Sequence, residues 1–182
     1  MSFLFEDFKG WKAYCETHNQ ALYEAVIGYE VEQKQATESD IWDGLGAAYQ
    51  VMKEAVQTGL TEDMKSMSGM IDNGAKKVMN YPTPVLSREF QVLISRALAA
   101  KEVNSCMGRV VAAPTAGASG ILPGVMVTLQ ELHDISDRKI MEGLLIGAGI
   151  ALIMEKRASI AGSVGGCQAE TGSAAAMGAG AM

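Results

Sequence analysis

The segment that most constrains this chain is residues 162–182, which carries a single charged residue, Glu170. Its other residues are mainly glycine, alanine and small polar residues, which offer water few groups to solvate. A second segment, residues 110–130, has no charged residue at all, and thirteen of the 20 glycines lie at or after Gly108. Glycine allows backbones to approach closely. We therefore expect closely packed, covered segments in the second half of the chain.

Length and charge limit the possible classes of protein. A chain of 182 residues suits one domain with a sizeable core. The net charge of −6 disfavours nucleic acid as a partner. The first twelve residues lack the basic start and long apolar run of a secretory signal, and the apolar run 143–154 is too short to span a membrane. We expect a cytoplasmic protein with no membrane or nucleic-acid partner.

The first half has the periodicity of helices. Apolar residues recur at three- and four-residue steps over residues 5–34, which predicts a stripe of helical rather than strand period. A second helix is predicted from about Thr37 to Thr58, with Gly59 as its stop signal. A third, rich in methionine, is predicted over residues 62–81. Ser87 is expected to cap a fourth helix over residues 88–104.

The second half is predicted to alternate loops with helices. We expect helices over residues 121–133 and 137–157, and a last helix from Cys167 onward. Only residues 109–113 have the composition of a strand, and one short segment cannot form a sheet. The predicted fold is all-α: a compact multi-helix domain over residues 1–182, with glycine-rich loops between the helices.

Two glycine-rich loops are the candidate sites for chemistry. "APTAGASG" at residues 113–120 offers backbone amides and the hydroxyls of Thr115 and Ser119 just before a helix, an arrangement suited to a small anion. A tight connection between packed helices explains the same pattern equally well. "GSVGGC" at residues 162–167 places Cys167 at a helix start, where a thiolate is favoured.

Other catalytic classes find little support in the residues. The three cysteines, Cys15, Cys106 and Cys167, are too widely spaced for a disulfide framework or a zinc knuckle. A cysteine hydrolase would need a histidine base, and neither His18 nor His133 is near Cys167 in sequence. His18 fits a packed, hydrogen-bonded role better than a catalytic one. No lysine lies between Ala112 and Ile135 to hold pyridoxal phosphate, and dinucleotide and P-loop motifs are absent.

Two long motifs together resemble a known family. "MGRVVAAPTAGASGILPGV" at residues 107–125, followed by "GSVGGCQAETGSAAAMGAGAM" at 162–182, is similar to the alpha chain or alpha domain of the bacterial iron–sulfur L-serine dehydratases. The resemblance is detailed over residues 87–182 and looser before them. It implies an L-serine ammonia-lyase that forms pyruvate and ammonia, in amino-acid degradation and gluconeogenesis. The implied partners are a beta chain or domain and further copies in a homo- or hetero-oligomer.

The resemblance also implies site residues. Cys167 matches a ligand of a [4Fe–4S] cluster, whose open iron would act as a Lewis acid on the substrate hydroxyl. Thr115, Gly117 and Ser119 match the segment expected to hold the substrate carboxylate or amine. A base that removes the α-proton is implied, but the resemblance does not identify which residue it is, and Asn104 and Glu170 are expected to bond to loop backbone.

The sequence also departs from the family pattern. The other cluster cysteines and the serine-binding signature of the beta part are not found in it, so we expect a C-terminally incomplete chain that is inactive alone and holds no cluster by itself. Two other classes remain open. One is a small-molecule binding or regulatory module without catalysis, and the other is a structural helical subunit.

Overall fold

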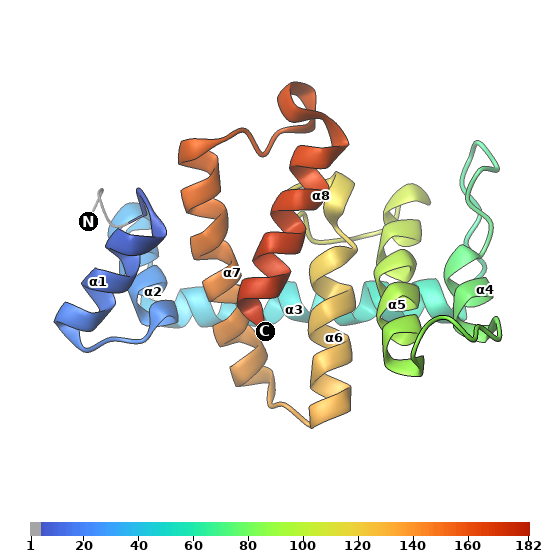
Figure 1. The fold of residues 1–182 in the computed structure, drawn as a ribbon, viewed down its shortest axis with the longest axis horizontal. Helices are drawn as coiled ribbons and strands as arrows, with labels where there is room; N and C mark the ends of the chain where they lie inside the picture. Colours follow the sequence, from blue (N-terminus) through green and yellow to red (C-terminus); the bar gives the residue numbers. More distant parts are fainter. Residues whose placement is uncertain (1–4) are drawn as a thin grey trace. The chain divides into compact units, whose positions relative to one another are not determined.

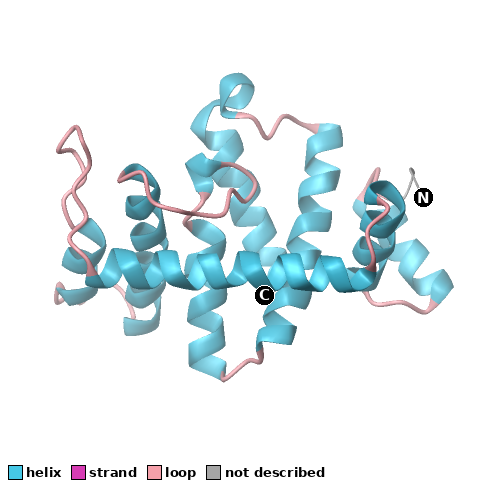
Figure 2. Ribbon diagram, turned by 180° about the vertical axis from the view of Figure 1, so that it is seen from behind, coloured by secondary structure: helices cyan, strands magenta, loops and turns pink. Residues whose placement is uncertain are grey.

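The computed structural model describes residues 5–182, so the first four of the twelve N-terminal residues that lack the pattern of a secretory signal lie outside it. Helices account for all the regular secondary structure in this range, and Figure 2 shows them joined by loops without a strand. The all-α prediction is confirmed. The elements are α1 (Phe8–His18), α2 (Leu22–Lys34), α3 (Glu38–Thr61), α4 (Gly74–Asn80), α5 (Arg88–Ser105), the 3-10 turn η1 (Ala116–Ala118), α6 (Ile121–His133), α7 (Asp137–Arg157) and α8 (Gly162–Ala181).

The helices form two compact units, and α3 runs from one into the other. Unit 1 contains the chain up to Ala47 together with Ser136–Met182, and unit 2 contains Ala48–Ile135. The expected single domain over residues 1–182 stays a prediction. Within residues 5–182, no helix is both long enough and apolar enough to cross a membrane.

Aromatic packing holds the core of unit 1 together. Phe5 packs edge-on against Trp11 and Tyr29, with ring centroids 5.3 and 4.9 Å away. Gly149 of α7 faces this cluster, because a Cβ atom there would lie 2.5 Å from Trp11. Glycine at this position therefore lets α7 approach the aromatic rings. The backbone of α8 lies equally close to Gly143 of α7, and Figure 1 shows these two helices side by side.

Unit 2 is built around α5, which packs against both α4 and α6. Gly124 of α6 is pressed against Ala97 of α5, since a Cβ atom on Gly124 would lie 2.7 Å from the Cβ atom of Ala97. In the same unit, the Tyr49 hydroxyl donates a hydrogen bond of 2.6 Å to Oε1 of Gln130. These contacts join α3, α5 and α6.

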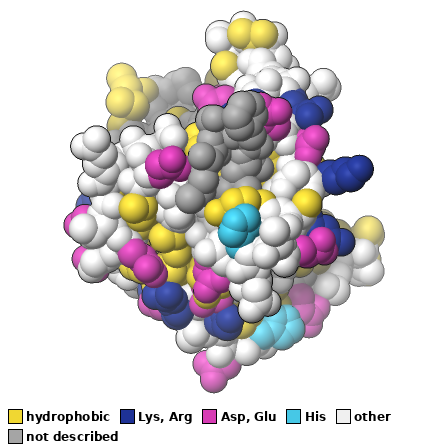
Figure 3. Space-filling view, turned by 90° about the vertical axis from the view of Figure 1, so that its left-hand side faces the viewer, with side chains coloured by type: hydrophobic (Ala, Val, Ile, Leu, Met, Phe, Trp, Pro, Cys, Tyr) yellow, Lys and Arg dark blue, Asp and Glu magenta, His cyan; other side chains and the backbone are white. Residues whose placement is uncertain are grey.

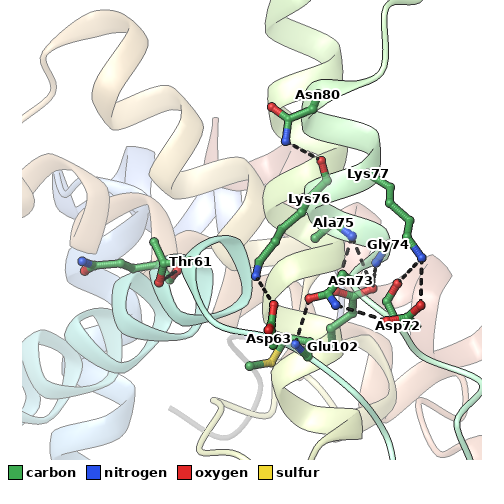
Figure 4. A network of polar contacts seen from close by, with 12 residues as sticks. Thr61, Asp63, Asp72, Asn73, Gly74, Ala75, Lys76, Lys77, Asn80 and Glu102 are labelled. Atoms are coloured by element: carbon green, nitrogen blue, oxygen red, sulfur yellow. Dashed lines mark hydrogen bonds and ion pairs between the residues drawn. The ribbon is translucent and has the colours of Figure 1, made fainter.

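A buried carboxylate attaches α4 to α5. Glu102 is 5% exposed, and its Oε1 accepts hydrogen bonds from the backbone amides of Gly74 at 2.7 Å and Ala75 at 3.3 Å. These amides belong to the first turn of α4, whose N–H groups have no partner within the helix. Figure 4 shows Glu102 at this point, with the ion pairs Lys76–Asp63 and Lys77–Asp72 nearby.

The structure corrects two helix boundaries in the first half. Residues 5–34 form two helices, because Asn19 ends α1 in the left-handed conformation with φ of 51°. Gly59 does not stop α3, which continues to Thr61. Gly59 is instead buried against the backbone of Ala99 on α5, where any side chain would clash.

The predicted methionine-rich helix over residues 62–81 is largely wrong. Only Gly74–Asn80 is helical, and the residues before it form a looped segment with one bridge between Lys65 and Asp72. Met67 is 97% exposed and Met70 is 86% exposed, whereas Met64 is buried, so only Met64 of these three methionines contributes to a core.

Most of the helix boundaries predicted from residue 87 onward agree with the structure. Ser87 caps α5 and Ser136 caps α7, each accepting a backbone N–H hydrogen bond. α6 and α7 have the expected bounds, and residues 109–113 form no strand. The last helix starts at Gly162 rather than Cys167, although its backbone is interrupted between the two.

Candidate functional site

The "PTAGASG" loop lies between α5 and α6 in unit 2 and contains η1. Asn104, near the end of α5, holds this loop, because its Nδ2 donates a 2.8 Å hydrogen bond to the carbonyl of Ala116. This is the loop-bonding role that we expected for Asn104. Gly117 lies at the centre of η1, and Ser119 directly follows η1. The loop is therefore hydrogen-bonded to α5 through Asn104, and it continues directly into α6.

Two hydroxyls of this loop have no hydrogen-bond partner within the described residues. Ser119 is 1% exposed, and its Oγ is buried without a partner. Thr115 is partly exposed, but its Oγ1 is also buried and unpartnered. A buried hydroxyl without a partner is costly, so proteins rarely retain one without a reason. Both therefore have the capacity to bind a polar group of a ligand.

The start of α6 adds further donor capacity to the loop. Gly120 is its N-cap residue and supplies no capping side chain. The first N–H groups of a helix have no partner inside it and carry a partial positive charge. The loop thus combines two free hydroxyls with an uncapped helix N-terminus, and residues 110–130 contain no charge. This arrangement suits a small anionic group.

Sequence reasoning missed one residue beside the loop. Lys101 lies on α5, and its Cβ would be 3.2 Å from a Cβ atom built on Gly120. It is one helical turn before Asn104, so both residues lie on the side of α5 that faces the loop. The glycine-rich motif begins after Ala112, and Lys101 lies outside it. The signal that could have found Lys101 is its spacing of three from Asn104, but that spacing has meaning only once α5 is known to contact the loop.

The second motif lies in unit 1, at the start of α8, and is described by itself. Helical geometry is interrupted at Gly166, which has φ of 69° and ψ of −173°, and resumes at Cys167. The thiol of Cys167 is exposed and free. Cys167 thus begins a helical segment directly after a glycine, as expected. One further helical turn, which begins at Gly162, lies before this glycine.

Glu170 and Gly162 lie together within α8. A Cβ atom on Gly162 would be 2.8 Å from Cδ of Glu170, so the glutamate side chain folds back onto the first residue of the helix. Glu170 is the only charged residue of α8. A carboxylate near a helix N-terminus is electrostatically favourable, which gives Glu170 a local structural role.

The other cysteines and His18 lie apart from these motifs. Burial, followed by the nearby Glu24 and Glu16, raises the pKa of the Cys15 thiol above its usual value. Cys106 is partly exposed and free. His18 is exposed and stacks on Tyr14, with its Nδ1 donating to the Tyr14 carbonyl at 2.9 Å, so it is hydrogen-bonded as expected but on the surface.

Side chains that could bind a metal are dispersed over the described part of the chain. Among residues 5–182, no three or more His, Cys, Asp and Glu side chains are grouped to hold a metal ion. A [4Fe–4S] cluster needs several thiolates at one place, so the described residues alone do not fit it. Cys167 could supply one ligand. On the face shown in Figure 3, acidic and basic side chains are interspersed, and no basic patch for nucleic acid stands out.

Comparison with known proteins finds one family. The family model described as "Serine dehydratase alpha chain" matches residues 17–182. The chain is 35% identical over 171 residues to the L-serine dehydratase alpha chain of Peptoniphilus asaccharolyticus, covering 92% of this chain and 59% of that one. It is 33% identical over 164 residues to a probable L-serine dehydratase alpha chain of Bacillus subtilis, covering 88% and 54%. A third relative, the L-serine dehydratase of Streptomyces coelicolor, is 35% identical over 165 residues, covering 87% of this chain and 36% of the relative.

Proposed function

The chain belongs to the serine dehydratase alpha-chain family, and from this premise we propose that it is the alpha part of an L-serine ammonia-lyase that forms pyruvate and ammonia. It spans somewhat more than half the length of the two alpha chains compared above. The proposed activity therefore belongs to the complete enzyme, in which this chain supplies a substrate-binding loop and a cysteine.

The observation that carries the proposal is the pair of unpartnered hydroxyls on Thr115 and Ser119. An amino-acid substrate has a carboxylate that can accept hydrogen bonds from both. Each bond from a hydroxyl to a charged group is worth about 1.5–3 kcal/mol. In the proposed site these hydroxyls bind and orient the substrate, with Gly117 between them leaving the loop backbone open to it.

We propose further that Cys167 is one thiolate ligand of a [4Fe–4S] cluster in the complete enzyme. Its exposed thiol follows the break at Gly166 and begins a helical segment, where a thiolate is favoured. The remaining ligands would come from outside the described residues, which contain no metal-binding group of three. The proposed partners are a beta chain or domain and further copies in an oligomer.

The test of the proposed function uses the complete enzyme, with the full-length alpha chain and its beta part assembled together. We expect formation of pyruvate and ammonia from L-serine in equal amounts. Calorimetry with L-serine measures binding independently of turnover. Binding without turnover would replace the proposal with a regulatory binding module, and neither binding nor turnover would leave a structural helical subunit.

A further inference from the structure

We infer that Lys101 is the cation that binds the substrate carboxylate, so that the carboxylate end of the amino acid lies at the "PTAGASG" loop. The inference rests on the proposed function, because it names which end of that substrate the loop holds. It concerns residues of unit 2 alone: α5, η1 and the start of α6.

The first step is the position of Lys101 on α5. Ala97, Lys101 and Asn104 are spaced four and three residues apart and lie along one side of the helix. Ala97 is pressed against Gly124, the Cβ of Lys101 lies next to Gly120, and Asn104 bonds to Ala116. This side of α5 therefore follows the loop and the first turn of α6. Lys101 lies between Ala97 and Asn104 on this side of α5, and its side chain is long and flexible enough to bring the ammonium to the loop.

The second step concerns charge. Lys101 is only partly exposed, and its ammonium makes no ion pair or hydrogen bond with any residue that the structure describes. The cations of the neighbouring elements differ in this respect: Arg96 of α5 pairs with Glu131, and Lys76 of α4 pairs with Asp63. The adjacent segment 110–130 has no charge to neutralise Lys101. The Lys101 ammonium is therefore not engaged by a carboxylate of the described residues and is available to an anionic ligand.

The third step is the match between the groups at this place. The Lys101 ammonium, the hydroxyls of Thr115 and Ser119, and the uncapped N-terminus of α6 all favour negative charge. An α-ammonium group would be repelled by the lysine and by the positive end of the helix. The carboxylate is the one group of a free amino acid that suits all of these partners. Its reacting carbon atoms would then point away from the loop.

The experiment compares Lys101→Met with Lys101→Arg in the complete enzyme, with Lys65→Met as a matched control. Lys65 is exposed and in the same unit. Loss of a charged hydrogen-bond partner should raise KM for L-serine about 10- to 100-fold in Lys101→Met, with a much smaller change in kcat. Lys101→Arg should stay within about threefold of the original enzyme, because it keeps the charge, and Lys65→Met should be unchanged.

A second measurement identifies the chemical group that Lys101 binds. L-Alanine carries a carboxylate, whereas L-alaninamide carries a neutral amide in its place. Lys101→Met should weaken inhibition by L-alanine about tenfold or more and leave inhibition by L-alaninamide unchanged. If both compounds weaken equally, or if only kcat falls, Lys101 does not bind the carboxylate and the inference is wrong.

The two proposals fail separately. If the original enzyme binds L-serine without turning it over, the lyase activity is wrong, while the effect of Lys101→Met on dissociation constants still decides the inference. If turnover occurs and Lys101→Met has an unchanged KM, only the inference is wrong. Should Lys101→Met fail to fold, as judged from its circular dichroism, Lys101→Gln provides the same comparison.

Discussion

Two buried serines in unit 2 show how differently one residue type is used. Ser95 is fully buried and donates a 2.7 Å hydrogen bond to the carbonyl of Ala75, which joins α5 to α4. Ser119 is equally buried but has no partner among the described residues. The first hydroxyl stabilises the fold. The second costs stability, which is consistent with a hydroxyl that is reserved for a ligand.

This contrast leads to a prediction for Ser119→Ala and Ser95→Ala. Replacing Ser95 leaves the Ala75 carbonyl unpaired and should lower the free energy of unfolding by about 1–2 kcal/mol. Replacing Ser119 removes an unsatisfied group and should leave the free energy of unfolding unchanged or slightly raised. In the complete enzyme, Ser119→Ala should nevertheless raise KM for L-serine about tenfold.

Urea denaturation of both variants and kinetics of the assembled enzyme measure these effects. Ser95→Ala serves as the control for loss of a buried hydroxyl. Equal destabilisation by the two substitutions, or an unchanged KM in Ser119→Ala, would indicate that the loop has only a structural role.

At the residue scale, the sequence predicts what a motif contains and misses what packing brings to it. Thr115, Gly117 and Ser119 stand in one contiguous motif, so the amino-acid sequence is enough to single them out. That the hydroxyls of Thr115 and Ser119 lack partners could not be predicted, because it depends on every neighbour in the fold. Lys101 was missed because it approaches the loop only through the packing of α5 on α6.

At the scale of elements, α8 is interrupted by one residue. Gly166 has φ of 69° and ψ of −173°, a conformation that is essentially restricted to glycine. No atom lies within 4 Å of a Cβ built at this position, so the constraint is conformational rather than steric. Gly172, six residues later, also has open space around its Cβ position but has ordinary helical geometry.

The two glycines predict opposite effects of the same substitution. Gly166→Ala should lower the free energy of unfolding by about 1–3 kcal/mol, because alanine is strained at this positive φ. Gly172→Ala should raise it by about 0.5–1 kcal/mol, since alanine is the better helix former at an exposed position. Thermal and urea unfolding of both variants provide the measurement. A neutral Gly166→Ala would mean that α8 is continuous through this position.

The helix predictions were accurate where periodicity and helix-end signals agree, and wrong where local hydrogen bonds oppose the periodicity. The bounds of α6 and α7 were predictable because periodicity and end signals agree at both ends, with Ser136 as the N-cap of α7. Residues 62–73 were wrongly predicted as helix because methionine favours helices and recurs there at helical spacing. In the structure, Asn73 adopts a left-handed φ of 54°. Its backbone N–H donates to the Met64 carbonyl, and its Oδ1 accepts a hydrogen bond from the Met64 N–H. Local polar bonds thus prevailed over propensity.

At the scale of the whole molecule, the two recognised motifs fall in different units. The "PTAGASG" loop belongs to unit 2 and Cys167 to unit 1, and α3 connects the units covalently. The sequence could predict both motifs from their order along the chain. It could not predict the division, because unit 1 combines the first and last segments of the chain, and such long-range pairing leaves no local pattern.

The three thiols of the chain differ in exposure. Cys167 is exposed, whereas Cys15 is buried and its pKa is raised by burial and then by Glu24 and Glu16. A higher pKa leaves less thiolate at a given pH, and thiolate is the reactive form. At neutral pH, iodoacetamide should therefore modify Cys167 first and Cys15 last, with Cys106 between them. Peptide mass spectrometry over a time course gives the order directly.

The same thiol reports on cluster binding without an activity assay. Several thiolates must meet to hold a cluster, and residues 5–182 contain no such group. Anaerobic reconstitution with iron and sulfide should therefore leave Cys167 alkylatable in the 182-residue chain and protect it in a full-length family alpha chain. Cys167→Ser should abolish iron binding and visible absorbance in that longer chain, whereas the control Cys106→Ser should retain both. A stable cluster on the 182-residue chain, or on the longer Cys167→Ser variant, would show that Cys167 is not the ligand.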